Sequence, residues 1–320
     1  MATKLKNTRI LVLGGFGFLG QNLQIAFSNT PYSVFYESRR TGCDITDLRS
    51  LIRTVTVVKP DVIVNAAAHV GSISYVSKYA GDVVRDNSLM YINLFEAIKQ
   101  TDPTIKVINP ISNCSYPGIV DVQHEDEWWN GPIHPSVESY GTPKKLGFII
   151  SECYKKQYGV QTVNLIVPNA YGPYDYLDQQ RTHAMNGIIV RMIEAKINGD
   201  KEFVIWGTGT PIREWIYMPD VARLIVEVIS KDLYDKLPNP LNIGQEYGVS
   251  INTTATNVKT YLEYDGNFVY DLTKQDGAPI KVLGSKLFKK HFPDFKFTPY
   301  EVGIKETVEY IVRLNRLLGT

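Results

Sequence analysis

A tyrosine and a lysine stand four residues apart in the segment Tyr140-Gly-Thr-Pro-Lys144. At the start of a helix, this spacing places both side chains on one face. An ammonium beside a phenol lowers the pKa of the phenol, which can then exchange a proton with a hydroxyl or a ketone of a substrate. Because the pair follows a predicted buried strand that ends at Ser112, the pattern predicts a site of acid–base chemistry at the edge of a sheet.

A glycine-rich turn near the N-terminus supplies a second chemical signal. The apolar segment 9–13 reads as a buried strand and leads directly into Gly14-Gly-Phe-Gly17-Phe-Leu-Gly20, after which a helix is expected over 18–28. This order of strand, turn and helix is typical of dinucleotide sites, where backbone amides at a helix N-terminus face the pyrophosphate. Cofactor contacts are therefore expected at Gly14, Gly17, Phe18, Leu19 and Gly20. A bound oxidised nicotinamide would add its positive charge to that of Lys144.

The residues after the second predicted strand, 33–37, bear on the form of the dinucleotide. An acidic residue there favours the free 2′-hydroxyl of NAD(H), whereas arginine favours the 2′-phosphate of NADP(H). Glu37 stands close to Arg39 and Arg40, and two guanidinium groups can clamp a phosphate. We expect NADP(H), with NAD(H) as the alternative. Asp44 either accepts a hydrogen bond from the adenine amino group or serves as a turn residue or helix cap.

Strands and helices alternate along the first half of the chain at intervals of roughly 30 residues, as βαβ units do. Helices are expected over 47–58, 80–100 and 143–158, and buried strands over 61–65, 105–111 and 161–167. This alternation predicts an α/β fold with a doubly wound parallel sheet of the Rossmann type. Beyond residue 169 the rhythm changes. We expect a dinucleotide-binding domain over 1–170 and a smaller α/β substrate domain over 171–320, with 213–246 returning to the first.

Composition narrows the classes of partner. The chain has 320 residues, with 34 Lys and Arg against 33 Asp and Glu, so the formal net charge is +1. This balance disfavours nucleic acid and anionic membranes as partners, and no apolar run approaches the ~18 residues that span a bilayer. Cys43, Cys114 and Cys153 lack the spacing of a metal or redox motif. We expect a cytoplasmic protein without a metal site.

Further segments resemble the extended short-chain dehydrogenase/reductases that act on nucleotide sugars, and the resemblance covers nearly the whole chain. The segments are Asn65-Ala-Ala-Ala-His-Val-Gly71, Ser112-Asn-Cys-Ser-Tyr-Pro117, Asn169-Ala-Tyr-Gly-Pro173, Gly207-Thr-Gly-Thr-Pro-Ile-Arg213, Asn242-Ile-Gly244 and Asp276-Gly-Ala-Pro-Ile-Lys281. Ser-x-Cys-x-Tyr-Pro followed later by His183 is similar to the branch of NADPH-dependent 3,5-epimerases/4-reductases of GDP-4-keto-6-deoxy sugars. The resemblance implies that activity, a GDP-sugar substrate, and a homodimer formed through the helices over 80–100 and 143–158.

The resemblance also implies roles for individual residues. It makes Cys114 the base and His183 the acid that invert carbons beside a C4 ketone, while Ser112 and Tyr140, supported by Lys144, stabilise charge on the C4 oxygen. Further cofactor contacts are expected at Ala66, Ala67, Tyr140, Lys144, Val167, Asn169 and His183. Contacts with the nucleotide sugar are expected at Asn169, Arg191, Trp206, Arg213, Asp276 and Lys281.

Some positions depart from the family pattern. Asn113 and Gly141 stand where serine and alanine are common, and Phe16 stands where some NADP-dependent members have arginine. The stretches 123–130 and 174–178 are expected to border the sugar cleft and could select another sugar. Three alternatives therefore remain: a C4-reductase of a GDP-4-keto deoxysugar or heptose without epimerisation, a 4-epimerase or dehydratase with bound NAD, and a catalytically silent cofactor-binding regulator.

Overall fold

The computed structural model describes residues 8–118, 120–274 and 276–318. Its centre is a six-stranded sheet in the order β10-β5-β4-β3-β1-β2, in which every pairing is parallel. The strands are β1 (Arg9–Leu13), β2 (Ser33–Glu37), β3 (Val62–Asn65), β4 (Lys106–Ser112), β5 (Thr162–Val167) and β10 (Leu241–Asn242). Strands β1, β3 and β5 are apolar along almost their whole length, as expected for strands covered on both faces.

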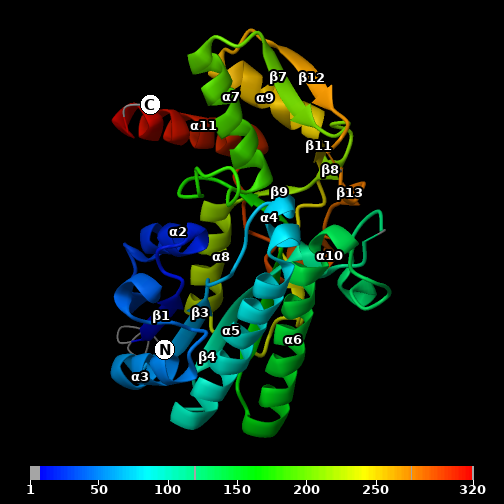
Figure 1. Cartoon of the computed structure of the whole chain (residues 1–320). Coiled ribbons are helices and arrows are strands. Elements are labelled where there is room, and N and C mark those ends of the chain that lie inside the picture. The colour runs from blue at the N-terminus through cyan, green and yellow to red at the C-terminus, as the bar shows by residue number, and fades with distance from the viewer. Residues whose placement is uncertain (1–7, 119, 275, 319–320) are drawn as a thin grey trace.

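Helices cover both faces of this sheet (Figure 1). On one face, α2 (Phe18–Phe27) packs against α8 (Met218–Ser230) over a shared apolar core. On the other lie α3 (Leu48–Val58), α5 (Ala80–Thr101) and α6 (Glu138–Tyr158). The predicted doubly wound α/β fold is therefore confirmed. Helix α6 begins five residues before the predicted 143, so Tyr140 lies in its first turn.

A second group of elements forms the upper end of the molecule in Figure 1. Helices α7 (Ala184–Asn198), α9 (Ile251–Leu262) and α11 (Tyr300–Leu318) share an apolar core with the parallel pair β7 (Glu202–Trp206) and β12 (Asn267–Asp271). Two small sheets complete it: β11 (Val249–Ser250), β8 (Ile212–Arg213) and β13 (Ile280–Lys281), and the pair β6 (Asn169–Tyr171) and β9 (Trp215–Tyr217).

The chain passes between the two groups more than once. Helix α8 and strand β10, both within 213–246, join the central sheet and its core. Helix α10 (Lys286–His291) returns as well, because Phe288 and Phe292 belong to that same core. Strand β8, in contrast, belongs to the small sheet. The remaining short helices are α4 (Ile73–Lys78), η1 (Arg39–Thr41), η2 (Asn113–Ser115), η3 (Glu125–Glu127) and η4 (Pro135–Val137).

Among the described ranges, none of the helices combines the length and the apolar character that a membrane span requires.

Candidate active site

A cavity of about 670 Å³ lies between the central sheet and the second group of elements. Its lining combines the carboxyl ends of β3, β4 and β5 with residues of α2, α6, α7, β7, β8 and β13. Seventeen of the residues predicted for the site line this one cavity: Gly17, Phe18, Leu19, Ala66, Ala67, Ser112, Cys114, Tyr140, Lys144, Val167, Asn169, His183, Arg191, Trp206, Arg213, Asp276 and Lys281. Gly14, Gly20, Arg39, Arg40 and Asp44 lie outside its lining.

The glycine turn packs closely against the helix that it opens. Gly17 is the N-cap residue of α2, and Gly14 has a φ of 78°, which favours glycine. A Cβ atom on Gly20 would lie 2.3 Å from the carbonyl oxygen of Gly14. Only glycine therefore lets α2 begin so close to the turn, and Gly17, Phe18 and Leu19 at its start line the cavity.

Arg39 and Arg40 are exposed in η1, directly after β2. Glu37, at the end of β2, accepts a hydrogen bond from the Thr41 hydroxyl, at 2.5 Å, so its carboxylate is engaged within its own turn. Asp44 Oδ1 accepts from both the amide and the hydroxyl of Thr46, at 2.9 and 2.7 Å. Asp44 therefore serves as a turn residue in the structure, which is one of its two predicted roles.

Lys144 and Tyr140 share one face of α6, as their spacing predicts. The ammonium of Lys144 is buried, lies 5.1 Å from the centre of the Tyr140 ring, and donates to the hydroxyl of Tyr91 on α5 at 3.1 Å. Tyr91 was not singled out in the sequence, because its role depends on the packing of α5 against α6. It fixes the position of the lysine.

The pKa of Tyr140 lies above its ordinary value. Burial raises this pKa most, the neighbouring Cys114 and Tyr91 raise it further, and Lys144 lowers it. The lowering expected from Lys144 is thus present, but burial outweighs it. The phenol keeps its proton near neutral pH, which is the state required of a donor to an oxyanion.

Cys114 lies in η2, at the carboxyl end of β4. The Ser112 hydroxyl caps this turn by accepting from the Cys114 amide at 3.2 Å. A Cβ atom on Gly141 would lie 2.4 Å from the Cys114 carbonyl oxygen, so the glycine found in place of the common alanine allows α6 to touch this turn. Burial alone would raise the pKa of the Cys114 thiol, but Lys281, Ser112 and Arg213 together bring it below its ordinary value.

His183 is the N-cap residue of α7 and is held by a carboxylate. Asp175 Oδ1 lies 2.9 Å from His183 Nδ1, and Asp175 Oδ2 accepts from the His183 amide at 2.9 Å. Burial would lower the pKa of His183, but Asp175, with a smaller contribution from Cys114, raises it above its ordinary value. The imidazole also packs 5.3 Å from the ring of Phe18, which joins it to the start of α2.

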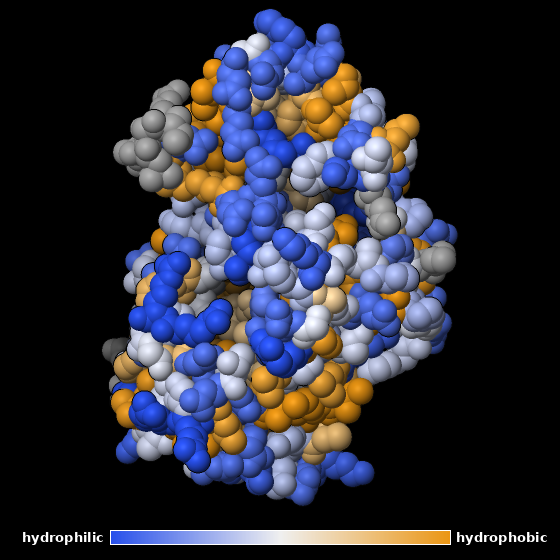
Figure 2. Space-filling model, in the orientation of Figure 1, coloured by the Kyte–Doolittle hydropathy of each residue, from blue (hydrophilic) through white to orange (hydrophobic). Residues whose placement is uncertain are grey.

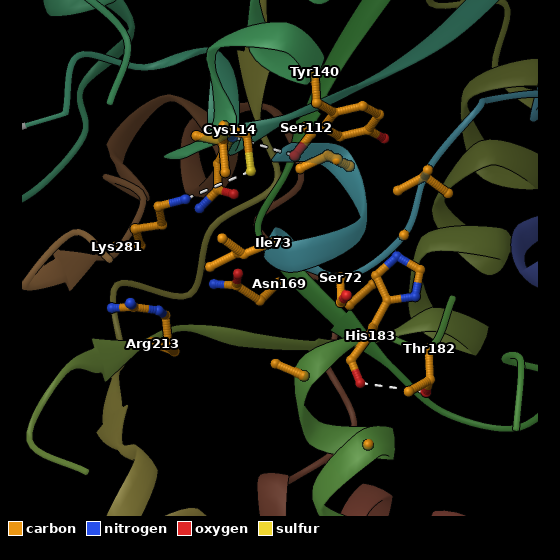
Figure 3. Close-up of a pocket in the computed structure, with 18 of the residues that line it drawn as sticks. Ser72, Ile73, Ser112, Cys114, Tyr140, Asn169, Thr182, His183, Arg213 and Lys281 are labelled. Carbon is orange, nitrogen blue, oxygen red and sulfur yellow. Dashed lines mark hydrogen bonds between the residues drawn. The ribbon is translucent and has the colours of Figure 1, made fainter. Parts of the chain in front are cut away.

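Cys114 and His183 lie on opposite sides of the pocket in Figure 3, with Asn169 and Ile73 drawn between them. Ser112 and Tyr140 lie on the Cys114 side, and Arg213 and Lys281 come from the small sheet. A substrate in this space would meet a thiol and an imidazole from different directions.

Further cations and an indole lie toward the second group of elements. The guanidinium of Arg191 lies 4.3 Å from the centre of the half-exposed Trp206 ring and donates to the Val204 carbonyl. Arg213 donates to the carbonyls of Ile212 and Asp276. The Asp276 carboxylate holds the amide and hydroxyl of Thr208. Asp276 therefore shapes a loop of the lining, rather than presenting a free carboxylate.

Two outcomes differ from the sequence analysis. The stretch 174–178 borders the cavity through Tyr176, but the contact of its Asp175 with His183 is not predicted from the sequence. The importance of the Asp175 carboxylate is apparent only in the folded structure, where it contacts His183. The stretch 123–130 contributes nothing to the described lining. Trp128 there is fully buried against Tyr116 and Phe148 and serves packing, whereas Trp129 is half-exposed.

Comparisons with known proteins identify similar chains and folds. Residues 10–244 match the model of a family described as the NAD dependent epimerase/dehydratase family. The GDP-L-fucose synthase of Dictyostelium discoideum is 28% identical over 307 residues, which is 95% of either chain.

Solved structures share the fold. A GDP-L-fucose synthetase from Naegleria fowleri bound to NADP has a TM-score of 0.84 at 24% identity, over 97% of this chain and 95% of that one. A GDP-6-OMe-4-keto-L-xylo-heptose reductase from C. jejuni has a TM-score of 0.86 at 20% identity, over 97% of this chain and 99% of that one.

Proposed function

Because this chain belongs to the NAD dependent epimerase/dehydratase family, we propose that it is an NADPH-dependent 3,5-epimerase and 4-reductase of a GDP-4-keto-6-deoxy sugar. The observation that carries the proposal is the presence, in one cavity, of two kinds of machinery. Ser112, Tyr140 and Lys144 serve reduction, and Cys114 and His183 serve inversion. A reductase alone requires only the first set.

The residues at the glycine turn fit a dinucleotide. The close packing at Gly14 and Gly20 leaves the first amides of α2 available to a pyrophosphate. Arg39 and Arg40 are exposed in the turn after β2, and the carboxylate of Glu37 is engaged with Thr41. This favours a 2′-phosphate over a free 2′-hydroxyl. When bound, the reduced nicotinamide supplies the hydride to C4 of the sugar.

The chain's own residues handle the charge on the C4 oxygen during reduction. As the ketone accepts hydride, this oxygen becomes an alkoxide. Tyr140 gives its proton to that oxygen, and the Ser112 hydroxyl donates a hydrogen bond to it. Lys144, held by Tyr91, offsets the negative charge that develops on the phenol.

Inversion uses the acidity of the carbons next to the same ketone. The Cys114 thiolate removes the proton at C3 or C5: a C–H bond breaks, an S–H bond forms, and the electron pair moves to the C4 oxygen. The His183 imidazolium then gives its proton to the opposite face of that carbon. The electron pair of the enolate forms the new C–H bond, and the C4 ketone is restored. Thiol and imidazole regain their starting states by proton exchange with solvent. Tyr140 and Ser112 stabilise the enolate oxygen at each centre.

The nucleotide end of the substrate meets the cationic side of the cavity. Arg191 and Arg213 donate to backbone carbonyls and no carboxylate pairs with them among the described ion pairs, so both remain able to meet a diphosphate. Trp206 offers a ring on which a base or a sugar can stack.

The test is turnover of a panel of GDP-4-keto sugars by the purified chain, with NADPH oxidation and product stereochemistry followed together. NADPH oxidation with GDP-4-keto-6-deoxymannose, with inversion at C3 and C5, supports the proposal. Turnover of 4-keto heptoses without inversion supports the reductase alternative instead.

We also propose that the chain forms a homodimer through α5 and α6. Both helices expose an isoleucine, Ile92 and Ile149, each 45% exposed, and Figure 2 shows apolar atoms gathered on this face of the molecule. Ile149→Glu is expected to yield a monomer in light scattering, and a native chain that is itself monomeric at micromolar concentration contradicts this.

A cytoplasmic location fits the need for a reduced Cys114, and all three cysteines are free thiols.

A further inference from the structure

The ammonium of Lys281 lies 3.5 Å from the Cys114 sulfur, although 167 positions separate the two residues. From the sequence, Lys281 is expected to contact the nucleotide sugar. In the structure its hydrogen-bonding partner is the thiol proposed as the base (Figure 3). This contact indicates that Lys281 has a different role.

The small sheet explains how the lysine reaches the thiol. Strands β8 and β13 are parallel and in register, with Lys281 beside Arg213. The fully buried carboxylate of Glu214 accepts from the amides of Leu283 and Gln245, at 2.7 and 2.5 Å, which fixes the chain next to β13. The backbone at Lys281 is thus fixed by strand pairing and, at the nearby Leu283, by a buried carboxylate.

The electrostatics of the pair favour an ionised thiol. Lys281 is 8% exposed, and none of the described ion pairs gives it a carboxylate partner. A buried ammonium beside a neutral thiol is poorly compensated, whereas beside a thiolate each charge stabilises the other. Arg213 adds positive charge on the same side, but its donors are engaged by backbone carbonyls.

We propose that Lys281 is a positioning residue that holds Cys114 as a thiolate, and thereby sets the ionisation of the base used for inversion. The thiol loses its proton to solvent before substrate arrives. The role of this thiolate in inversion rests on the function proposed above. The ionisation itself does not, because it is a property of the protein without substrate.

The experiment is alkylation of Cys114 by iodoacetamide across pH, followed by peptide mass spectrometry on the full chain without substrate. Lys281→Met is expected to slow alkylation of Cys114 at pH 7 by about tenfold or more, because an opposite charge at this distance favours the ionised form. Lys281→Arg keeps the charge and should restore most of the rate. Lys274→Met removes another cation from the cavity lining and should leave the rate as in the native chain. Cys153, exposed on α6, is an internal reference in the same digests.

An alkylation profile of Cys114 that is the same in Lys281→Met as in the native chain overturns the proposal. Thiolate absorbance at 240 nm, taken as the difference between the native chain and Cys114→Ser, gives a second measurement that needs no lysine variant. A native Cys114 that ionises no more readily than an ordinary thiol also overturns it. If the thiol responds as expected but no GDP-sugar is turned over, the proposed function fails and the lysine–thiolate pair stands.

Discussion

The buried carboxylate of Asp175 holds His183 at two points, the imidazole Nδ1 and the backbone amide, each at 2.9 Å. Its side chain is 0% exposed, whereas that of His183 is 29% exposed toward the cavity. The carboxylate therefore orients the ring so that Nδ1 faces the loop and Nε2 is left for the cavity. It also favours the imidazolium, which is the form that can donate a proton.

We predict that Asp175→Asn shifts the alkaline limb of inversion to lower pH. The acid role requires protonated His183, so inversion is lost as the pH rises through the pKa of this residue. Asp175 raises that pKa and burial lowers it, so removing the charge moves the loss toward acid. The measurement is the pH dependence of solvent deuterium uptake at C3 and C5. An alkaline limb in the same place as in the native chain would show that the carboxylate has only a structural role.

Tyr140→Phe is expected to slow reduction at C4 by roughly 100-fold to 10,000-fold, as the loss of a general acid does. The phenol is the proton donor to the C4 oxygen, and its ring is retained in the variant. Cofactor and GDP-sugar binding, measured by fluorescence and calorimetry, should stay close to native. Near-native NADPH oxidation in single turnovers would remove Tyr140 from the reaction.

Arg39→Ala and Arg40→Ala are expected to weaken binding of NADPH about tenfold or more each, as the loss of a charge-assisted hydrogen bond does. Binding of NADH, which lacks the 2′-phosphate, should change little. Arg49→Ala, at an exposed arginine in the first turn of α3, is the matched control and should bind both dinucleotides as the native chain does. Equal weakening for NADPH and NADH would contradict recognition of the phosphate by these residues.

Gly141→Ala tests the contact between α6 and the turn that carries Cys114. The added Cβ would lie 2.4 Å from the Cys114 carbonyl oxygen, so we expect a loss of about 1–3 kcal/mol in stability and a slower inversion. Gly81→Ala in α5 is the control, because a Cβ there meets nothing within 4 Å. Thermal unfolding of the two variants checks this. A Gly141→Ala protein as stable and as active as Gly81→Ala would show that the turn yields freely.

Most of the sheet follows from local sequence patterns, whereas much of the predicted cavity lining follows from the resemblance to a known family. The strand, glycine turn and helix over 9–27 form one continuous unit, and Tyr140 and Lys144 share a helix face because of their spacing alone. Asp175, in contrast, lies in an irregular loop after Tyr174, whose φ of 73° no pattern indicates. The contact of Lys281 with Cys114 depends on the register of β13 with β8. Both pairings are products of tertiary structure, so the sequence marked His183, Cys114 and Lys281 without their partners and did not mark Asp175.

The most direct test of the account is a single reaction in deuterium oxide. The purified chain is incubated with GDP-4-keto-6-deoxymannose and NADPH, and the mass and stereochemistry of the product are determined beside NADPH absorbance. We predict NADPH oxidation with one deuteron incorporated at C3 and one at C5, and with both centres inverted. In Cys114→Ser, deuterium incorporation at both carbons should fall strongly. NADPH oxidation that yields a product without deuterium and with its stereocentres unchanged would contradict the account, and would leave a 4-reductase.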